Sequence, residues 1–286
     1  IVVPAQDQDC SAYGYVIDNH GFEASGGAHG TDSTLTVNNV APDVTPALIS
    51  LTQASGTDLY LTVESGETTG FTLQYTATDN NSCINAASSS EITNYELSIY
   101  RSGIGSTTCN ISGGAFNANY CYTSAVPTTT WNISCTASST SCTGSSDTSQ
   151  VWDCTFPLWY IADPTDGTAT STQYPSQNWL AQVQAVDDDN ATGSLSESTI
   201  GVEVRSFLAF ALNTLTIPYG ALEPGQQNDP LVATTTVSAT GNVGLDKSVE
   251  GESMCTTYTS STLCPNSSTS TIPDSEQRFA TGTVTY

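Results

Sequence analysis

The sequence predicts an all-β fold of the sandwich type, and three observations support that prediction. Apolar and polar residues alternate with a period of two in several segments, which places successive side chains on opposite faces of a strand. Clusters of Gly, Ser, Asn, Asp and Pro, which favour turns, separate these segments. No segment combines a period of 3.6 residues with a composition rich in Ala, Leu, Glu and Lys, so no helix is expected.

Five segments carry the clearest alternation and are the expected strands. They are residues 58–65 (DLYLTVES), 71–79 (FTLQYTATD), 93–102 (TNYELSIYRS), 179–187 (WLAQVQAVD) and 198–206 (STIGVEVRS). Strands with one apolar face must bury that face against another layer, and a second sheet is the partner that such a chain can supply.

The charge balance excludes two classes of partner. The chain of 286 residues carries 28 Asp and Glu against four Lys and Arg, a formal net charge of −24. A surface that binds nucleic acid needs clustered cations for the phosphates, and an anionic membrane surface attracts the same cations. The longest wholly apolar run, residues 207–212 (FLAFAL), is too short to span a bilayer. We therefore expect neither a nucleic-acid partner nor membrane insertion.

Nine cysteines without a Cys-x-x-Cys spacing favour disulfides over a zinc site, and disulfides indicate an exported protein. If cysteines that are close in sequence pair with each other, one long-range pair and one unpaired cysteine remain. The expected bonds are Cys109–Cys121, Cys135–Cys142, Cys255–Cys264 and, by subtraction, Cys83–Cys154, with Cys10 unpaired or bonded to another chain.

An internal repeat gives the domain organisation. Residues 13–42 align with residues 180–206: each copy has an alternating strand ending in Asp, an acidic or Asn-rich turn with Gly, and a Thr/Val strand. Asp18 and Asp187 occupy the same place, and residues 73–83 form a weaker third copy of the strand-to-Asp element. This pattern, leading to "NVAP", resembles the last hairpin of PKD (polycystic-kidney-disease-type) and related immunoglobulin-like repeats of microbial surface proteins. The resemblance implies tandem β-sandwich domains.

The repeat and the proline-rich linker at residues 38–46 set the expected boundaries. Residues 1–43 would be the terminal strands of an incomplete immunoglobulin-like domain, or a donor segment. Residues 44–205 would form a sandwich with a Cys-rich insertion, and residues 206–286 a second, incomplete sandwich. Two explanations stay open: the chain is part of a longer tandem array, or the first 43 residues of one subunit complete the last domain of another by strand addition.

The carboxylate-rich turn after residues 179–187 is the candidate metal site. Calcium binds six to eight oxygens from carboxylates, amides and carbonyls. The candidate ligands are Asp187, Asp189 and Asn190, beside Asp188, together with Asp163 and Asp166. The alternative is a simple turn, because Asp and Asn bond their own backbone. An EF-hand loop starting at Asp187 would need Gly and Glu where the chain has Thr192 and Ser198. Calcium is the one cofactor considered, and none is required.

A catalytic site is not expected. Asp18, His29 and Ser253 resemble the Asp, His and Ser motifs of subtilisin-like proteases in chain order. However, Asp18 and His29 are too close in sequence for that family, and its glycine-rich α/β scaffold is missing. A triad is recognised by geometry rather than by short strings. The chain is therefore predicted not to be an enzyme.

Two further residue sets were weighed. The aromatic residues of the strands are expected in the core rather than on a sugar-binding face; they are Trp131, Trp152, Trp159, Tyr160 and Trp179. Asn-x-Ser/Thr sequons, which could carry glycans in loops, begin at Asn80, Asn110, Asn132, Asn190 and Asn266.

These observations favour a structural role. We expect a self-associating subunit of an extracellular or cell-surface assembly, such as a filament joined by strand complementation between subunits. The alternative is an adhesin or carbohydrate-binding stalk module of a larger surface protein. The near absence of Lys and Arg would leave trypsin few cleavage sites.

Overall fold

A computed structural model describes residues 6, 8–12, 19, 33–53, 56, 58–62, 70–85, 89–112, 116–125, 132–167, 173–216, 223, 225, 235–255 and 271–276. The chain divides into two compact units, residues 1–244 and 245–286. Among the described residues the regular structure is antiparallel β-sheet and two 3-10 turns, Pro46–Leu48 and Asp274–Glu276. The all-β prediction is confirmed.

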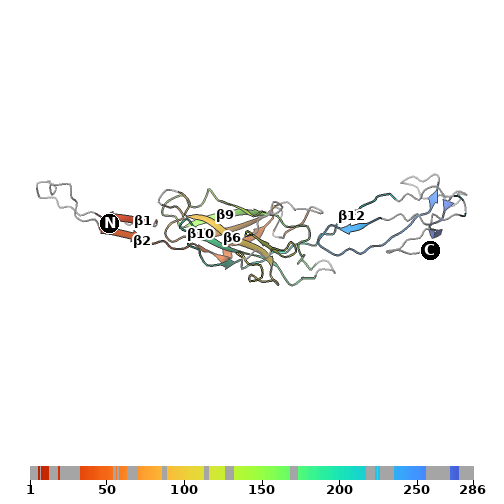
Figure 1. The fold of residues 1–286 in the computed structure, drawn as a ribbon, viewed down its shortest axis with the longest axis horizontal. Coiled ribbons are helices and arrows are strands. Elements are labelled where there is room, and N and C mark those ends of the chain that lie inside the picture. The colour runs from red at the N-terminus through yellow and green to blue at the C-terminus, as the bar shows by residue number, and fades with distance from the viewer. Residues whose placement is uncertain are drawn as a thin grey trace. The chain divides into compact units, whose positions relative to one another are not determined.

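Two antiparallel sheets make up the body of the first unit, which we call the sandwich (Figure 1). The first sheet has the order β3-β5-β9-β8, with β4 also paired to β5. Its strands are β3 (Asp43–Val44), β4 (Ser50–Thr52), β5 (Phe71–Thr78), β8 (Ser134–Ala137) and β9 (Ser149–Phe156). The second sheet has the order β11-β10-β6-β7. Its strands are β6 (Ile92–Arg101), β7 (Cys121–Thr123), β10 (Trp179–Asp187) and β11 (Ser196–Glu197).

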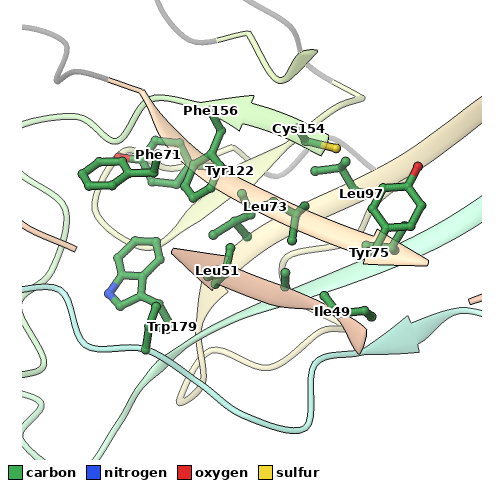
Figure 2. Packing of buried hydrophobic residues seen from close by; sticks show 14 of the residues in the cluster. Ile49, Leu51, Phe71, Leu73, Tyr75, Leu97, Tyr122, Cys154, Phe156 and Trp179 are labelled. Atoms are coloured by element: carbon green, nitrogen blue, oxygen red, sulfur yellow. The ribbon is translucent and has the colours of Figure 1, made fainter. Parts of the chain in front are cut away.

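Alternation along the central strands builds the core between the sheets. In β5 every second side chain, from Phe71 to Ala77, is fully buried. In β10 the same holds from Trp179 to Ala185. Figure 2 shows side chains of both sheets meeting, with Trp179 and Tyr122 on the same side of the cluster as Phe71. The buried cluster begins at Val44 and ends at Val204.

Three of the five expected strands are confirmed almost to the residue, as β5, β6 and β10. Residues 198–206 instead form isolated bridges: Val202 pairs with Trp179, and Val204 pairs in parallel with Leu59. In the expected strand at residues 58–65, the described pairing is this bridge at Leu59. Residues 63–65 lie outside the described part of the chain.

Three short ladders complete the described structure. β1 (Gln8–Ala12) pairs with β2 (Ser33–Val37), and β12 (Phe210–Leu212) with β13 (Val237–Ala239). In the second unit β14 (Met254–Cys255) pairs with β15 (Thr271–Ile272). Residues 206–213 and 235–244 pair with each other, and Ser206 and Asn242 bond Asp166 and Ala162 of the sandwich; all lie in the first compact unit.

The disulfides correct two expected pairs and confirm one. Cys109–Cys121 forms as expected. Cys135 bonds Cys154 rather than Cys142, because β8 lies beside β9 and the register places these two residues directly opposite each other. Cys83 bonds Cys142 instead of Cys154.

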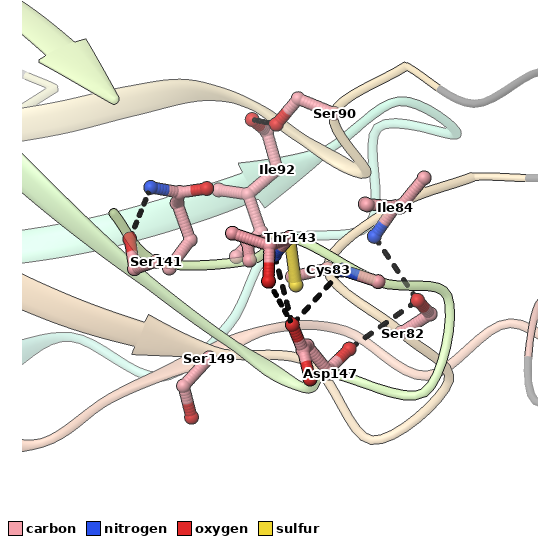
Figure 3. Close-up of a disulfide and its surroundings, with 12 residues drawn as sticks. Ser82, Cys83, Ile84, Ser90, Ile92, Ser141, Thr143, Asp147 and Ser149 are labelled. Carbon is pink, nitrogen blue, oxygen red and sulfur yellow. Dashed lines mark hydrogen bonds between the residues drawn. A yellow bond between two sulfur atoms is a disulfide. The ribbon is translucent and has the colours of Figure 1, made fainter. Parts of the chain in front are cut away.

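The segment around Cys83–Cys142 is also held by hydrogen bonds (Figure 3). Cys83 N donates to Asp147 O, and the Asp147 carboxylate accepts from the backbone of Thr143 and Gly144. These bonds hold the pKa of Asp147 below its ordinary value. Of the other expected bonds, Cys255 is in a disulfide, and Cys264 lies outside the described residues. Cys10 lies in β1, opposite Leu35.

A buried hydroxyl in this core gives a first prediction. Tyr75 is fully buried and stacks on Trp152 at a ring distance of 6.3 Å, yet its Oη has no hydrogen-bond partner among the described residues. Burial raises the pKa of Tyr75 above its ordinary range, so the hydroxyl stays protonated and unsatisfied. We expect Tyr75→Phe to raise the free energy of unfolding by about 1 kcal/mol in urea denaturation.

Tyr122 supplies the matched control for that experiment. It is equally buried, but its Oη donates to Ala118 O and accepts from Trp159 N at 2.9 Å. Tyr122→Phe should therefore lower stability by about 1–3 kcal/mol. Equal losses in both variants would contradict the assignment of an unsatisfied hydroxyl at Tyr75.

Candidate functional site: the two junctions of the sandwich

The carboxylate-rich turn fastens a neighbouring segment. Asp187 is buried, its Oδ1 accepts from Ala191 N at 2.6 Å, and its Oδ2 accepts from Asn39 Nδ2 at 2.9 Å. Asn190 has a φ of 65°, which the tight turn requires and which Asn tolerates. Asp188 accepts a bond from Asn85 Nδ2 at 2.6 Å. The turn thus joins residues 38–40 to the end of β10.

The five residues predicted to bind calcium are not brought together. Asp187, Asp189 and Asn190 follow β10, whereas the backbone carbonyl of Asp163 accepts from Trp179 Nε1 at the start of the same strand. A nine-residue strand separates its ends by about 27 Å. Within the described residues, no three His, Cys, Asp or Glu side chains are grouped so that they could hold a metal ion.

Asp163 belongs instead to a buried ion pair. Its Oδ2 lies 2.9 Å from Nε of Arg101, whose guanidinium also donates to Gln177 and lies 3.4 Å from the ring centre of Tyr174. Burial raises the pKa of Asp163, and Arg101 opposes that rise. Asp163 N donates to Asn119 O at 2.7 Å. This arrangement fixes the start of β10.

The first junction is the entry of the chain into the sandwich at residues 38–43. Asn81 follows the end of β5, and its Oδ1 accepts from Val40 N at 2.6 Å while its Nδ2 donates to Asn38 O at 3.0 Å. A Cβ on Gly193 would lie 1.6 Å from Pro42 O, so only glycine allows the turn after β10 to pack on this segment. The entry segment is therefore held from two different strands.

The second junction is the exit at residues 204–207. Arg205 Nε donates to Asp58 Oδ2 at 3.0 Å, and Asp166 accepts from both Ser206 N and Ser206 Oγ. Asn242 Oδ1 accepts from Phe207 N at 2.7 Å, and its Nδ2 donates to Arg205 O at 3.0 Å. Asp166, a predicted calcium ligand, thus acts here as a hydrogen-bond acceptor for the exit segment.

Neither junction asparagine was predicted as a site residue. Both follow an Ala-Thr pair, Ala77-Thr78 and Ala239-Thr240, but with different spacings. Asn81 falls within the sequon that begins at Asn80. The partners lie 41 and 35 residues away, so no local pattern reveals the contact.

The other candidate residues divide between the core and the surface. Trp152 and Trp179 are buried, Trp159 and Tyr160 are partly buried, and Trp131 lies outside the described residues. The sequon asparagines that the structure describes are all exposed: Asn80, Asn110, Asn132 and Asn190. Asn266 lies outside the described part.

Of the protease-like residues, the structure describes Ser253. Ser253 Oγ accepts a bond from Asp274 N at 3.3 Å. Asp18, His20 and His29 fall outside the described residues.

No protein-family model, curated protein or solved structure matches the chain. Three disulfides indicate a protein outside the reducing cytoplasm. Among the described residues, no helix has the length and apolar character needed to cross a membrane.

Proposed function

We propose that this protein is a structural component of an extracellular or cell-surface assembly, built from tandem immunoglobulin-like sandwiches. The strand order supports the fold part of the proposal. The orders β3-β5-β9-β8 and β11-β10-β6-β7 correspond to the A-B-E-D and G-F-C sheets of an immunoglobulin-like sandwich, with β7 added at the edge of the second. In this scheme β12 and β13 begin the next sandwich.

One observation carries the functional part: the chain enters and leaves the sandwich at opposite ends, and both segments are fastened. The entry segment bonds Asp187 at the end of β10, and Val202, just before the exit segment, pairs with Trp179 at the start of β10. Tension applied along the chain would therefore pass through the whole length of the sandwich. Three disulfides reinforce the same unit, and each limits the extension of an unfolded chain.

Self-association is the second part of the proposal. β12 and β13 form a two-stranded ladder, and a sheet of two strands is marginally stable unless further strands or a second layer cover it. Among the described residues β12 and β13 pair only with each other, and β1 and β2 form a second two-stranded pair that can add to such a sheet. Addition of this pair from one subunit to the open sheet of another would build a filament by strand complementation.

Negative-stain electron microscopy of the purified protein tests this proposal. We expect linear assemblies that grow with protein concentration, because end-to-end addition leaves one open sheet at each step. The Cys10→Ser variant and a reduced sample would show whether a disulfide between subunits adds to the contact. Single particles at every concentration, confirmed by light scattering, would contradict self-association and favour the role of an adhesin or stalk module.

A further inference from the structure

The two junctions share one register, although their sequences differ. In the ladder of β3 and β5, Asp43 pairs with Thr78, and Val40 and Asn81 lie three residues before and three residues after that pair. In the ladder of β12 and β13, Phe210 pairs with Ala239, and Phe207 and Asn242 lie three residues before and three after. Each asparagine therefore lies opposite its linker residue, just beyond the end of the ladder.

The side-chain bonds of the two asparagines to the linker are also the same, whereas their backbone amides differ: Asn81 N donates to Asp79 Oδ1 and Asn242 N to Phe207 O. Each side-chain oxygen accepts from the backbone N–H of the linker residue opposite, Val40 or Phe207. Each side-chain nitrogen donates to the carbonyl two residues earlier, that of Asn38 or Arg205. The side-chain amide thus makes the two hydrogen bonds to the linker that the backbone of the neighbouring strand would make if the ladder continued.

We propose that Asn81 and Asn242 are equivalent junction residues in successive modules, and that the exit face of a module is the binding surface for the asparagine of the next. This inference rests on the tandem-module part of the proposed function. The exit face presents two backbone carbonyls, Ala162 O and Arg205 O, and the Nδ2 of Asn242 donates to both at 3.0 Å. The partner of this surface is therefore a primary amide on another module of the same kind.

The chemistry of the site selects asparagine. A primary amide offers one acceptor and two donors on a planar group, and all of these are used at the exit face. An ionised carboxylate could accept from Phe207 N but would face two carbonyl oxygens with no hydrogen to donate. Gly241 also permits the close approach, because a Cβ there would lie 2.1 Å from Phe207 O.

The consequence is a junction without a free hinge. Arg205 and Phe207 are tied to the sandwich and to the ladder of β12 and β13 within three residues. The asparagine thereby fixes the position at which the strand of one module becomes the first strand of the next. A junction fixed in this way is required for modules to stack in a constant register rather than move freely on a linker.

Hydrogen exchange of the full chain, resolved by mass spectrometry, tests the inference. In Asn242→Asp and Asn242→Ala we expect the amides of residues 205–209 to exchange at least about tenfold faster, because the junction opens without unfolding the sandwich. Asn81→Asp should do the same for the amides of residues 38–41. Asn213→Ala, at an exposed asparagine of the same ladder, should leave both segments unchanged. Peptides of β6 and β10 report whether each variant keeps its core.

The outcomes separate this inference from the proposed function. Faster exchange at one junction only would overturn the equivalence of Asn81 and Asn242, and unchanged exchange at both would overturn the role of the amide. If a variant unfolds globally, Asn242→Gln provides the second test, because it retains the amide and displaces it by one methylene. Exchange at residues 205–209 as slow as in the wild type would then contradict the fixed geometry. Single particles in electron microscopy would overturn filament formation and leave the exchange result standing.

Discussion

Removing the Cys83–Cys142 disulfide by a double Cys→Ala substitution is expected to lower the free energy of unfolding by about 4 kcal/mol. The bond closes a segment with a sequence separation of 59 residues, and the chain entropy that a disulfide removes from the unfolded state grows with the closed length. A loss of that size is a large share of the total stability of a domain. Chemical denaturation of the oxidised proteins measures it directly.

The Cys109–Cys121 bond provides the control for loop length. Its sequence separation is 12 residues, so the corresponding double substitution should cost about 3 kcal/mol. Cys83 in the first bond and both cysteines of the second are fully buried, so loss of packing contributes to the cost in each variant. A smaller cost for Cys83–Cys142 than for Cys109–Cys121 would show that local packing, rather than loop closure, determines the stabilisation.

The central strands could be predicted from sequence because their alternation of apolar and polar residues matches the burial of one strand face. Residues 71–78 and 179–187 each have one face in the core, so their apolar side chains recur at every second position. The segment at residues 198–206 alternates as well, but Gly201 lies against Asn178 and Trp179, and pairing is limited to bridges at Val202 and Val204. Alternation predicts burial of one face and does not specify a continuous ladder.

Long-range contacts were the part that sequence could not provide. Proximity in the chain predicts a Cys135–Cys142 bond, yet the order of β8 and β9 places Cys154 opposite Cys135. That order follows from the topology of the sheet, which no local pattern encodes. For the same reason the sequence predicts Asp187 as a possible metal ligand, whereas its carboxylate bonds Asn39 from a segment 148 residues away.

Replacing Arg101 by Met is expected to lower the free energy of unfolding by about 3–5 kcal/mol, because it leaves a partly buried carboxylate without its cation. The side chains of Arg101 and Asp163 are only 5% and 15% exposed, and Arg101 also packs on the ring of Tyr174. Met retains much of the apolar packing, so the loss reports chiefly on the charge. Urea denaturation at neutral pH measures the loss.

The pH dependence of that loss identifies its cause. Burial raises the pKa of Asp163, and Arg101 opposes the rise, so the pKa should be higher still in Arg101→Met. When a carboxyl has a folded-state pKa above its unfolded value, the folded state binds the proton more tightly, and the penalty present at higher pH is relieved as pH falls through the folded pKa. The deficit of Arg101→Met should therefore be smaller at about pH 5 than at about pH 7.5.

Arg101→Met combined with Asp163→Asn has no carboxylate to protonate, so its deficit should not change between these two pH values. A deficit in Arg101→Met that is equally independent of pH would assign the loss to packing on Tyr174 instead of to the unpaired charge.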